Sequence, residues 1–380
     1  MSNDLTVFPF DIQVLAFNRP EYLENCLVGL QAQTLAIDPK RIFFWQDGYS
    51  GSRDEHRGLP DKTEKSLKLI RKHFPDSEVI VSQKNLGIGL SFKDAEENAF
   101  VHRGNEWGIF IEEDNVLQDY YLEVILKLIN KVKKFDEIVQ LDAFGDYKNQ
   151  TGQDYFIPMH SWAFALRSEH YFERKELLSG YEDILKDDSY FKRDTSRIND
   201  YFANYGIRPV ASSQDYIKRI LMSHYNRIAL TTSFSGANNI GAFGEHFNPE
   251  VYNQLGYQFQ APAIEVQALP PITQKTILSL VWNQLGYLEA EFNIEKDSLK
   301  SERDILVAAH EAACADRDLA LAHANAARDA AVEERISAVT AANAARDAAV
   351  EERNQLLNST VWRSTKFIRF VIGKFKNLIR

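Results

Sequence analysis

The sequence predicts an α/β fold in which a mostly parallel sheet carries helices on both faces, followed by a long helical segment. Two observations lead to this prediction. From residue 9 to about 150, short runs rich in β-branched and aromatic residues alternate with segments of helical spacing. Such alternation is typical of parallel strands joined by covering helices. Beyond about residue 275, Ala, Glu, Arg and Asp dominate, and neither Pro nor Gly occurs from Tyr287 to Ile372.

The first 150 residues contain five predicted strands, which are Phe10–Phe17, Arg41–Asp47, Glu78–Ser82, Trp107–Glu112 and Ile138–Asp142. The first intervening helix begins near Pro20, because proline suits the first turn of a helix. The other predicted helices are Lys62–His73, Gly89–Arg103 and Asp119–Lys134. Ligands of parallel sheets bind at the carboxyl ends of the strands, so a site is expected at that edge.

Residues 150–260 keep an α+β character but lose the simple alternation. Ser161–Arg167 and Arg227–Thr232 are predicted strands, and Ser213–Tyr225 is a predicted helix. The Gly/Asn-rich stretch at 235–244 is expected to be a loop. Such a loop could close over a ligand.

The tail from 287 to 358 has an internal repeat. The sequence ANAARDAAVEER occurs at Ala324–Arg335 and again eighteen residues later, at Ala342–Arg353. Eighteen residues make about five helical turns, so both copies present the same face. Because the apolar side is mostly alanine, a coiled coil that joins copies of the chain is favoured over a single charged helix.

The segment from 359 to 380 is basic and apolar. Trp362–Arg380 contains six Lys or Arg residues and no acid, together with several large apolar side chains. This pattern favours an amphipathic helix on an anionic membrane surface. The alternative is a helix that caps the tail or packs against the rest of the chain.

Composition excludes several classes of protein. A net charge of −10 over 380 residues argues against a nucleic-acid binder. The two cysteines, Cys26 and Cys314, lie far apart and fit a reducing compartment. The first residues lack a signal-peptide pattern, and no apolar run has the length of a membrane span. We therefore expect a cytoplasmic protein that associates with the inner face of the cell membrane.

The sharpest polar cluster is Glu112-Glu113-Asp114, which follows the apolar run Ile109–Ile111. Neighbouring carboxylates repel one another, and a divalent cation or bound hydroxyl groups would offset that cost. Oxygen ligands of this kind suit Mn²⁺ or Mg²⁺ and leave coordination positions for a diphosphate. By itself, a solvated acidic turn is the better interpretation of the triplet, so the context decides.

Polar residues also follow the other predicted strands. Asn18 and Arg19 follow the first strand, Asp47 ends the second, and Asn85 precedes a helix after the third. Each is an ordinary turn residue when taken alone. Because successive strand ends meet at one edge of the sheet, together they favour a site for a ligand such as a nucleotide.

The order FNRPEYL, WQDG, NLGIGLSFKDAEENAF and IFIEEDN resembles the nucleotide-binding half of GT-A glycosyltransferases. It is closest in plan to the N-acetylglucosaminyltransferase I type and to related bacterial family-2-like enzymes, over about residues 10–250. The resemblance implies that Asp47 contacts the nucleotide base, Glu112 faces the donor sugar and Glu113 the ribose. Asp114 would bind the metal that holds the diphosphate. The family triplet is commonly Glu-Asp-Asp, so Glu113 departs from it by one methylene.

Three residues are candidates for the acceptor side. Trp162 could stack on a sugar face, or be part of the core. Asp215 begins the helix after Ser213 and either caps it or, as the resemblance implies, is the general base for the acceptor hydroxyl. His246 could contact metal or phosphate, or be an ordinary loop histidine.

The sequence therefore predicts a GT-A domain at 1–265, a linker at 266–286, the coiled coil and the basic helix. The expected reaction is metal-dependent, inverting transfer from a UDP-linked sugar to a glycan hydroxyl in bacterial surface-polysaccharide assembly, with a lipid-linked acceptor as a candidate. One alternative is a sugar-nucleotide nucleotidyltransferase, but its usual Gly-rich N-terminal loop with Arg and Lys is not found. The other is a non-catalytic coiled-coil scaffold. Phosphate-loop, Gly-x-Ser-x-Gly and zinc-ligand motifs do not occur in the sequence.

Overall fold

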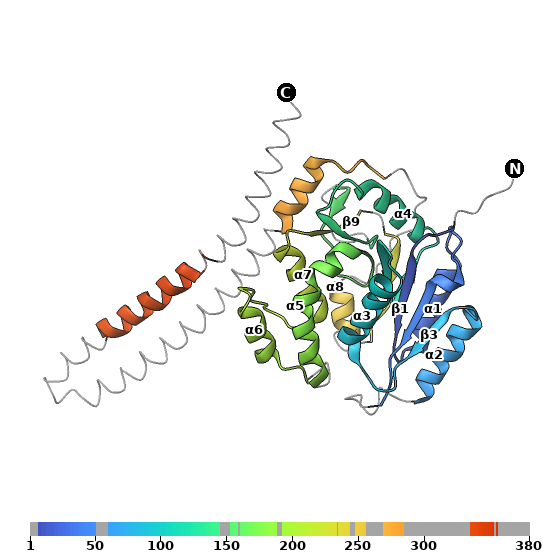
Figure 1. The fold of residues 1–380 in the computed structure, drawn as a ribbon, viewed down its shortest axis with the longest axis horizontal. Coiled ribbons are helices and arrows are strands. Elements are labelled where there is room, and N and C mark those ends of the chain that lie inside the picture. The colour runs from blue at the N-terminus through green and yellow to red at the C-terminus, as the bar shows by residue number, and fades with distance from the viewer. Residues whose placement is uncertain are drawn as a thin grey trace, which may run out of the picture. The chain divides into compact units, whose positions relative to one another are not determined.

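Alternating strands and helices build the first of the two compact units into which the chain divides, Met1–Gln284; the second unit is Leu285–Arg380. The structure is a computed structural model of the chain (Figure 1). It describes residues 7–50, 60–144, 153–158, 160–187, 192–233, 235–243, 248–255, 269–284, 335–352 and 355.

A large mixed sheet forms the centre of the first unit. Among the described residues its strands are β1 (Asp11–Ala16), β2 (Ile42–Gln46), β3 (Glu78–Val81), β4 (Trp107–Glu112), β6 (Ile138–Leu141), β7 (Tyr155–Phe156), β8 (Ala163–Arg167) and β9 (Ile228–Thr232). Their order is β3-β2-β1-β4-β8-β6-β9-β7. The predicted parallel pairing holds for β3-β2-β1-β4 and for β6 with β9.

Two strands depart from the parallel plan. β8 runs antiparallel to both of its neighbours, β4 and β6, and β7 runs antiparallel to β9. Because β8 is antiparallel to β6, the chain enters β8 at the edge of the sheet where β6 ends. A parallel neighbour would have needed a crossover connection. The antiparallel β8 places residues 160–162 beside the carboxyl end of β4.

Helices cover both faces of this sheet (Figure 1). They are α1 (Pro20–Gln31), α2 (Pro60–His73), α3 (Gly87–Glu97), α4 (Tyr121–Val132), α5 (Ser168–Asp187), α6 (Thr195–Ala203), α7 (Gln214–His224) and α8 (Pro249–Leu255), with the shorter η1 (Pro39–Arg41) and η2 (Asn98–His102). Side chains of β4 alternate between the faces. Ile109 and Ile111 pack with α1, α2 and α4, whereas Phe110 packs with α3, η2 and α5.

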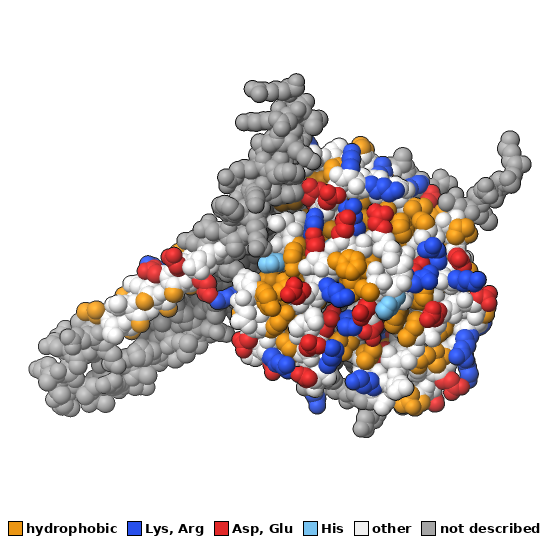
Figure 2. All heavy atoms as spheres, viewed as in Figure 1, with side chains coloured by type: hydrophobic (Ala, Val, Ile, Leu, Met, Phe, Trp, Pro, Cys, Tyr) orange, Lys and Arg blue, Asp and Glu red, His pale blue; other side chains and the backbone are white. Residues whose placement is uncertain are grey.

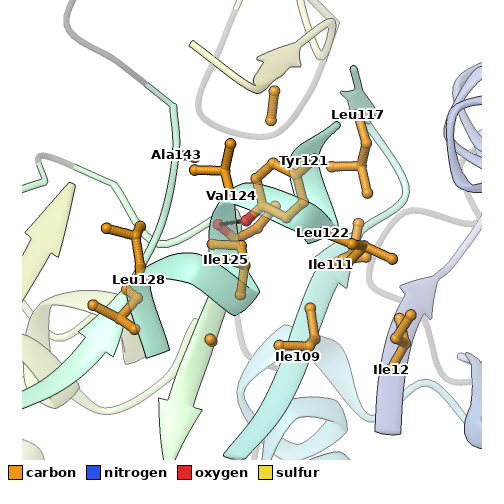
Figure 3. Close-up of a cluster of buried hydrophobic side chains, with 14 of the residues drawn as sticks. Ile12, Ile109, Ile111, Leu117, Tyr121, Leu122, Val124, Ile125, Leu128 and Ala143 are labelled. Atoms are coloured by element: carbon orange, nitrogen blue, oxygen red, sulfur yellow. Dashed lines mark hydrogen bonds between the residues drawn. The ribbon is translucent and has the colours of Figure 1, made fainter. Parts of the chain in front are cut away.

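The core beneath α4 ties this helix to the end of the sheet. Figure 3 shows the ring of Tyr121 beside Leu117 and Ala143. Its fully buried hydroxyl donates to the carbonyl oxygen of Ala163, at 2.8 Å. A buried hydroxyl needs such a partner. The bond fixes the first residue of β8, next to Trp162.

The Gly/Asn-rich stretch contains a strand where a loop was predicted. β10 (Ala237–Asn239) pairs antiparallel with β5 (Asn115–Leu117) in a separate two-stranded ribbon. The side-chain amide of Asn239 donates to the side-chain oxygen of Asn115, at 3.2 Å, and both residues are buried. The loop prediction is therefore wrong at Ala237–Asn239. Asparagine is common in turns, so the sequence did not show that Asn239 is buried and hydrogen-bonded to Asn115.

Residues 269–284 belong to the first unit, whereas the sequence placed a linker at 266–286. A helix runs over 274–284, and Ile272, Ile277 and Leu280 join the main core cluster. The side chain of Gln284 donates to the Ser223 hydroxyl at 2.7 Å and to the carbonyl oxygen of Arg227 at 3.1 Å. The apolar residues Ile277 and Leu280, one turn apart, explain why this segment packs against the sheet unit.

The described part of the second unit is a helix at 335–352 and residue 355. Its apolar residues Ile336 and Val339 are 60% and 55% exposed. The coiled coil predicted at 287–358 extends beyond these residues and stays a prediction, and the basic segment at 359–380 lies outside the described residues. Among the described helices, none combines the length and the apolarity that crossing a bilayer requires.

Candidate functional site

The acidic triplet lies at the carboxyl edge of the sheet. Glu112 is the last residue of β4, and Glu113 and Asp114 follow it, with exposed fractions of 2% and 8%. The backbone N–H of Glu113 donates to the carbonyl oxygen of Leu15 in β1, at 3.0 Å. The parallel strands thus bring their carboxyl ends together. Because Glu113 and Asp114 are buried, the alternative of a solvated acidic turn does not fit them.

Arg19 pairs with two of these three acids. Its Nε donates to Glu113 Oε1 at 2.7 Å, and its Nη1 donates to Asp114 Oδ2 at 2.8 Å. The second oxygen of Glu113 accepts the backbone N–H of Phe17, at 2.8 Å. Burial by itself would lower the pKa of Arg19. The negative charges of Asp114 and Glu113 outweigh this effect and raise the pKa above its ordinary value. Asn18, the residue before Arg19, is buried. The ion pairs explain how a buried carboxylate pair is tolerated.

Glu112 connects the triplet to helix α7. Burial raises the pKa of Glu112 well above its ordinary value, and the negative charge of Asp114 adds to this effect. Arg19 opposes it, while Asp215 and Glu113 raise it further. The carboxylate of Asp215 therefore lies close enough to act on Glu112, although the two residues are far apart in the sequence. The predicted donor residue and the predicted base share one electrostatic environment.

Asp47 holds the turn that opens α3. Its carboxylate accepts backbone N–H groups from Gly48, Leu86 and Gly87 and the side-chain amide of Asn85, at distances of 2.8 to 3.0 Å. A carboxylate has about four such acceptor positions. Burial raises the pKa of Asp47 to about 6, against the lowering effect of the three N–H groups. Contact between Asp47 and a nucleotide base stays a prediction, and in this structure the carboxylate is a structural anchor.

Glycine is required where the turn enters α3. Gly87 has φ of +73°, in the left-handed region that other residues rarely adopt. Its N–H is one of the groups that bind Asp47. The segment NLGIG opens a helix after the third strand, as predicted, and its N–H groups bind the Asp47 carboxylate at the end of β2, which was not predicted.

Gly241 is a site residue that the sequence analysis did not single out. A Cβ on Gly241 would lie 2.3 Å from Asp114 Oδ2, and the carbonyl oxygen of Asp114 accepts the N–H of Ile240 at 2.8 Å. The backbone of 240–241 thus covers the Asp114 carboxylate. The signal was present, since Gly241 lies in the Gly/Asn-rich stretch. His246, just beyond that stretch, lies outside the described residues.

The donor atoms of Asp114 fit a hard divalent cation that takes most of its ligands from elsewhere. Among the described residues, no group of three or more His, Cys, Asp or Glu side chains could enclose a metal ion. Mg²⁺ commonly binds one or two carboxylates and completes its shell with phosphate oxygens and water. Asp114 can supply such a carboxylate. The cation would then either share the Asp114 carboxylate with the guanidinium of Arg19, which binds Oδ2 in this structure, or displace that guanidinium.

Trp162 lies beside the triplet and also packs against the main core cluster. Its carbonyl oxygen accepts the N–H of Glu112 at 3.0 Å and the side-chain amide of Asn115 at 3.2 Å. The Trp162 ring is partly buried and stacks on the ring of His160, with centroids 4.1 Å apart and planes 3° from parallel. His160 was missed by the sequence analysis, because a single histidine before a strand has no distinctive pattern.

Asp215 is in the first turn of α7 and is exposed. The N-cap position belongs to Ser213, whose side chain makes no capping hydrogen bond. Asp215 is therefore not the N-cap residue, so the capping alternative given for it in the sequence does not hold. A carboxylate in the first turn still interacts favourably with the helix dipole.

A buried ion cluster anchors α7 to two other helices. Glu96 Oε1, on α3, accepts Lys218 Nζ of α7 and Arg174 Nη2 of α5, each at 2.8 Å. The three residues are at most 8% exposed. Lys218 lies one turn after Asp215, so this cluster determines where the first turn of α7 sits. Figure 2 shows one face of the molecule, on which Lys and Arg side chains are interspersed among Asp and Glu over the described residues.

Comparisons with known proteins give a weak structural likeness. No protein-family model and no curated protein matches the sequence. The crystal structure of S. aureus TarS is similar with a TM-score of 0.33 and 13% identity, over 59% of this chain and 35% of that one. For S. aureus TarS 1-349 the values are 0.28 and 13%, over 44% and 49%. For TarS 1-349 in complex with UDP they are 0.32 and 13%, over 52% and 55%. This chain thus spans between about a third and just over half of those chains. A likeness at this level does not decide function, which has to come from the site.

Proposed function

We propose that the chain is a nucleotide-sugar-dependent glycosyltransferase of the GT-A type, with UDP as the nucleotide of its donor. The observation that carries the proposal is the convergence of Arg19, Glu113 and Asp114 at the end of β4, beside Glu112, on which the charge of Asp215 also acts. A cation and several carboxylates at the carboxyl edge of an α/β sheet suit a diphosphate and a sugar hydroxyl.

In the proposed reaction, an acceptor hydroxyl attacks the anomeric carbon of the donor sugar. The new bond joins the acceptor oxygen to this carbon, and the bond from the carbon to the diphosphate breaks. Asp215 takes the proton of the acceptor hydroxyl, which implies inversion. Arg19, held by Glu113 and Asp114, would supply a positive charge to the departing diphosphate. Mn²⁺ or Mg²⁺ held by Asp114 would stabilise the charge on that group.

The remaining site residues are proposed to bind and position the donor. Glu112 would accept hydrogen bonds from donor sugar hydroxyls, and Glu113 would face the ribose. Asp47 and Asn85 would face the base through the turn that they fix. These roles come from the resemblance of the sequence to the glycosyltransferase family.

The test is a screen of nucleotide sugars with the purified full chain, with Mn²⁺ and with EDTA. We expect metal-dependent release of one nucleotide, lost in Asp114→Ala. Asp215→Asn should slow transfer to an acceptor by about 100-fold or more, the usual contribution of a general base. Asp183→Ala, on the exposed Asp183–Lys186 pair of α5, is the matched control. If no donor binds and Asp114→Ala changes nothing, the scaffold alternative becomes the better explanation.

We also propose an acceptor, a membrane location and self-association for the chain. The acceptor is a glycan, with a lipid-linked glycan of bacterial surface-polysaccharide assembly as the candidate. The basic segment Trp362–Arg380 would hold the enzyme at the inner membrane surface, and 287–358 would join copies of the chain. Deleting Trp362–Arg380 should abolish membrane association, and unchanged fractionation would contradict this part.

A further inference from the structure

Arg19 is the cation that neutralises the carboxylate of Asp114 in this structure. Its Nη1 donates to Asp114 Oδ2 at 2.8 Å, and its Nε donates to Glu113 Oε1 at 2.7 Å. The side chain of Arg19 is 28% exposed, whereas the side chains of Glu113 and Asp114 are 3% and 11% exposed. The guanidinium therefore lies on the solvent side of the two carboxylates, from which an ion or a diphosphate has to approach.

The other neighbours of the Asp114 carboxylate are held by bonds of their own. Asn115 Nδ2 donates to Asp114 Oδ1 at 3.2 Å and also to two backbone carbonyl oxygens. The backbone of Gly241 lies against Oδ2, and its N–H donates to the side-chain oxygen of Asn239 at 2.9 Å. Both asparagines are buried. Of these neighbours Arg19, at the end of a long and partly exposed side chain, is the one that can leave Asp114 without breaking the interior.

Arg19 keeps an anchor when it leaves Asp114. Its bond to Glu113 uses Nε and does not depend on Nη1. Glu113 is fixed in turn, because its second oxygen accepts the backbone N–H of Phe17 at 2.8 Å. The guanidinium also lies over the ring of Tyr22, 5.5 Å from its centre. A turn about this anchor frees the terminal N–H groups at the edge of the sheet, and such groups bind phosphate oxygens in a fork.

A divalent cation and Arg19 need the same oxygen. Oδ2 of Asp114 accepts Nη1 of Arg19 and is covered by the backbone of Gly241. Two positive charges on one carboxylate oxygen also repel each other. Displacement of the guanidinium is therefore favoured over sharing of the carboxylate.

Resting on the function proposed above, we propose that Arg19 is an exchangeable counter-ion of Asp114. Without donor, Arg19 occupies Oδ2. When the donor binds with a divalent cation, Arg19 yields Oδ2 and turns its free N–H groups to the diphosphate, while Glu113 still holds Nε. The cation and the diphosphate then strengthen each other's binding, because one removes Arg19 from Asp114 and the other gives it a new partner.

The test measures two affinities of the full chain, for Mn²⁺ alone by electron paramagnetic resonance and for UDP in saturating Mn²⁺ by calorimetry. Arg19→Met should bind Mn²⁺ about tenfold more tightly, because the ion no longer has to break a charged hydrogen bond. The same variant should bind UDP about tenfold more weakly, because one charged donor is lost. Asp114→Asn added to Arg19→Met should remove the gain in Mn²⁺ affinity. Arg71→Met, at an exposed arginine of α2, changes the net charge equally and should alter neither affinity.

The opposite signs separate the exchange from a structural role of Arg19, which predicts that Arg19→Met weakens both ligands. Arg19→Lys keeps a positive charge but lacks the fork that holds two acids at once, so it decides the matter if Arg19→Met does not fold. Its Mn²⁺ affinity should lie above that of the wild type.

The remaining outcomes overturn defined parts. Unchanged or weaker Mn²⁺ binding by both Arg19 variants overturns the exchange, and Mn²⁺-dependent UDP binding by the wild type would then leave the proposed function standing. UDP binding that Arg19→Met leaves unchanged overturns the move to the diphosphate. Tighter Mn²⁺ binding by Arg19→Met in a chain that binds no nucleoside diphosphate supports the competition at Asp114 and overturns the proposed donor.

Discussion

The replacement Lys218→Met removes one of two cations from a buried carboxylate. Lys218 Nζ lies 2.8 Å from Glu96 Oε1 and 4.6 Å from the centre of the Phe92 ring. Methionine keeps the apolar stem against Phe92 but leaves Glu96 with Arg174 as its remaining partner. Breaking a buried pair usually costs about 3–5 kcal/mol, and the remaining Arg174 favours the lower end, about 3 kcal/mol.

The matched control is Lys186→Met. Lys186 pairs with Asp183 at 2.7 Å, and both side chains are more than half exposed, so its loss should cost less than about 1 kcal/mol. Urea unfolding of both variants gives the comparison. Tryptophan fluorescence suits the assay, because four of the five tryptophans are in the first unit, namely Trp45, Trp107, Trp162 and Trp282. Equal losses in the two variants would refute the reasoning, as would a loss at Lys218 below about 1 kcal/mol.

Two further predictions concern buried groups near the sheet edge. Burial raises the pKa of Asp142 from its ordinary 3.8 to about 7. The unfolded chain ionises first, so stability should fall as pH rises from about 4 through 7, by at most about 4 kcal/mol. Asp142→Asn should lack this loss, and a stability difference from wild type that stays constant from pH 4 to 8 would contradict it. Gly241→Ala places a Cβ 2.3 Å from Asp114 Oδ2, so it should lower the free energy of unfolding by about 1–3 kcal/mol. It should also reduce the rise in melting temperature that UDP with Mn²⁺ produces, and an undiminished rise would contradict this prediction.

The strands at the site could be predicted because their sequences carry a local signal. The run Ile109–Ile111 before Glu112 identified β4 to the residue, and Pro20 identified the first turn of α1. β8 was located within two residues, but its antiparallel direction was not predicted, because direction depends on where the connection returns.

Contacts between distant segments could not be predicted in the same way. The clash that makes glycine necessary at Gly241 involves Asp114, which is more than a hundred residues earlier. The environment of His160 depends on the Trp162 ring, on which it stacks, and on the charge of Asp215 on another helix. Arg19 was expected at the crevice, but its pairing with both Glu113 and Asp114 is a property of the folded chain.

The central claim is that the carboxyl edge of the sheet binds a nucleoside diphosphate with the help of Asp114. The most direct measurement is calorimetric titration of the full chain with UDP, in Mn²⁺ and in EDTA, beside Asp114→Asn. We predict binding in Mn²⁺ that is lost in EDTA and in the variant. Absence of binding by UDP, GDP, CDP and dTDP alike, or UDP binding that Asp114→Asn leaves unchanged, would contradict the claim.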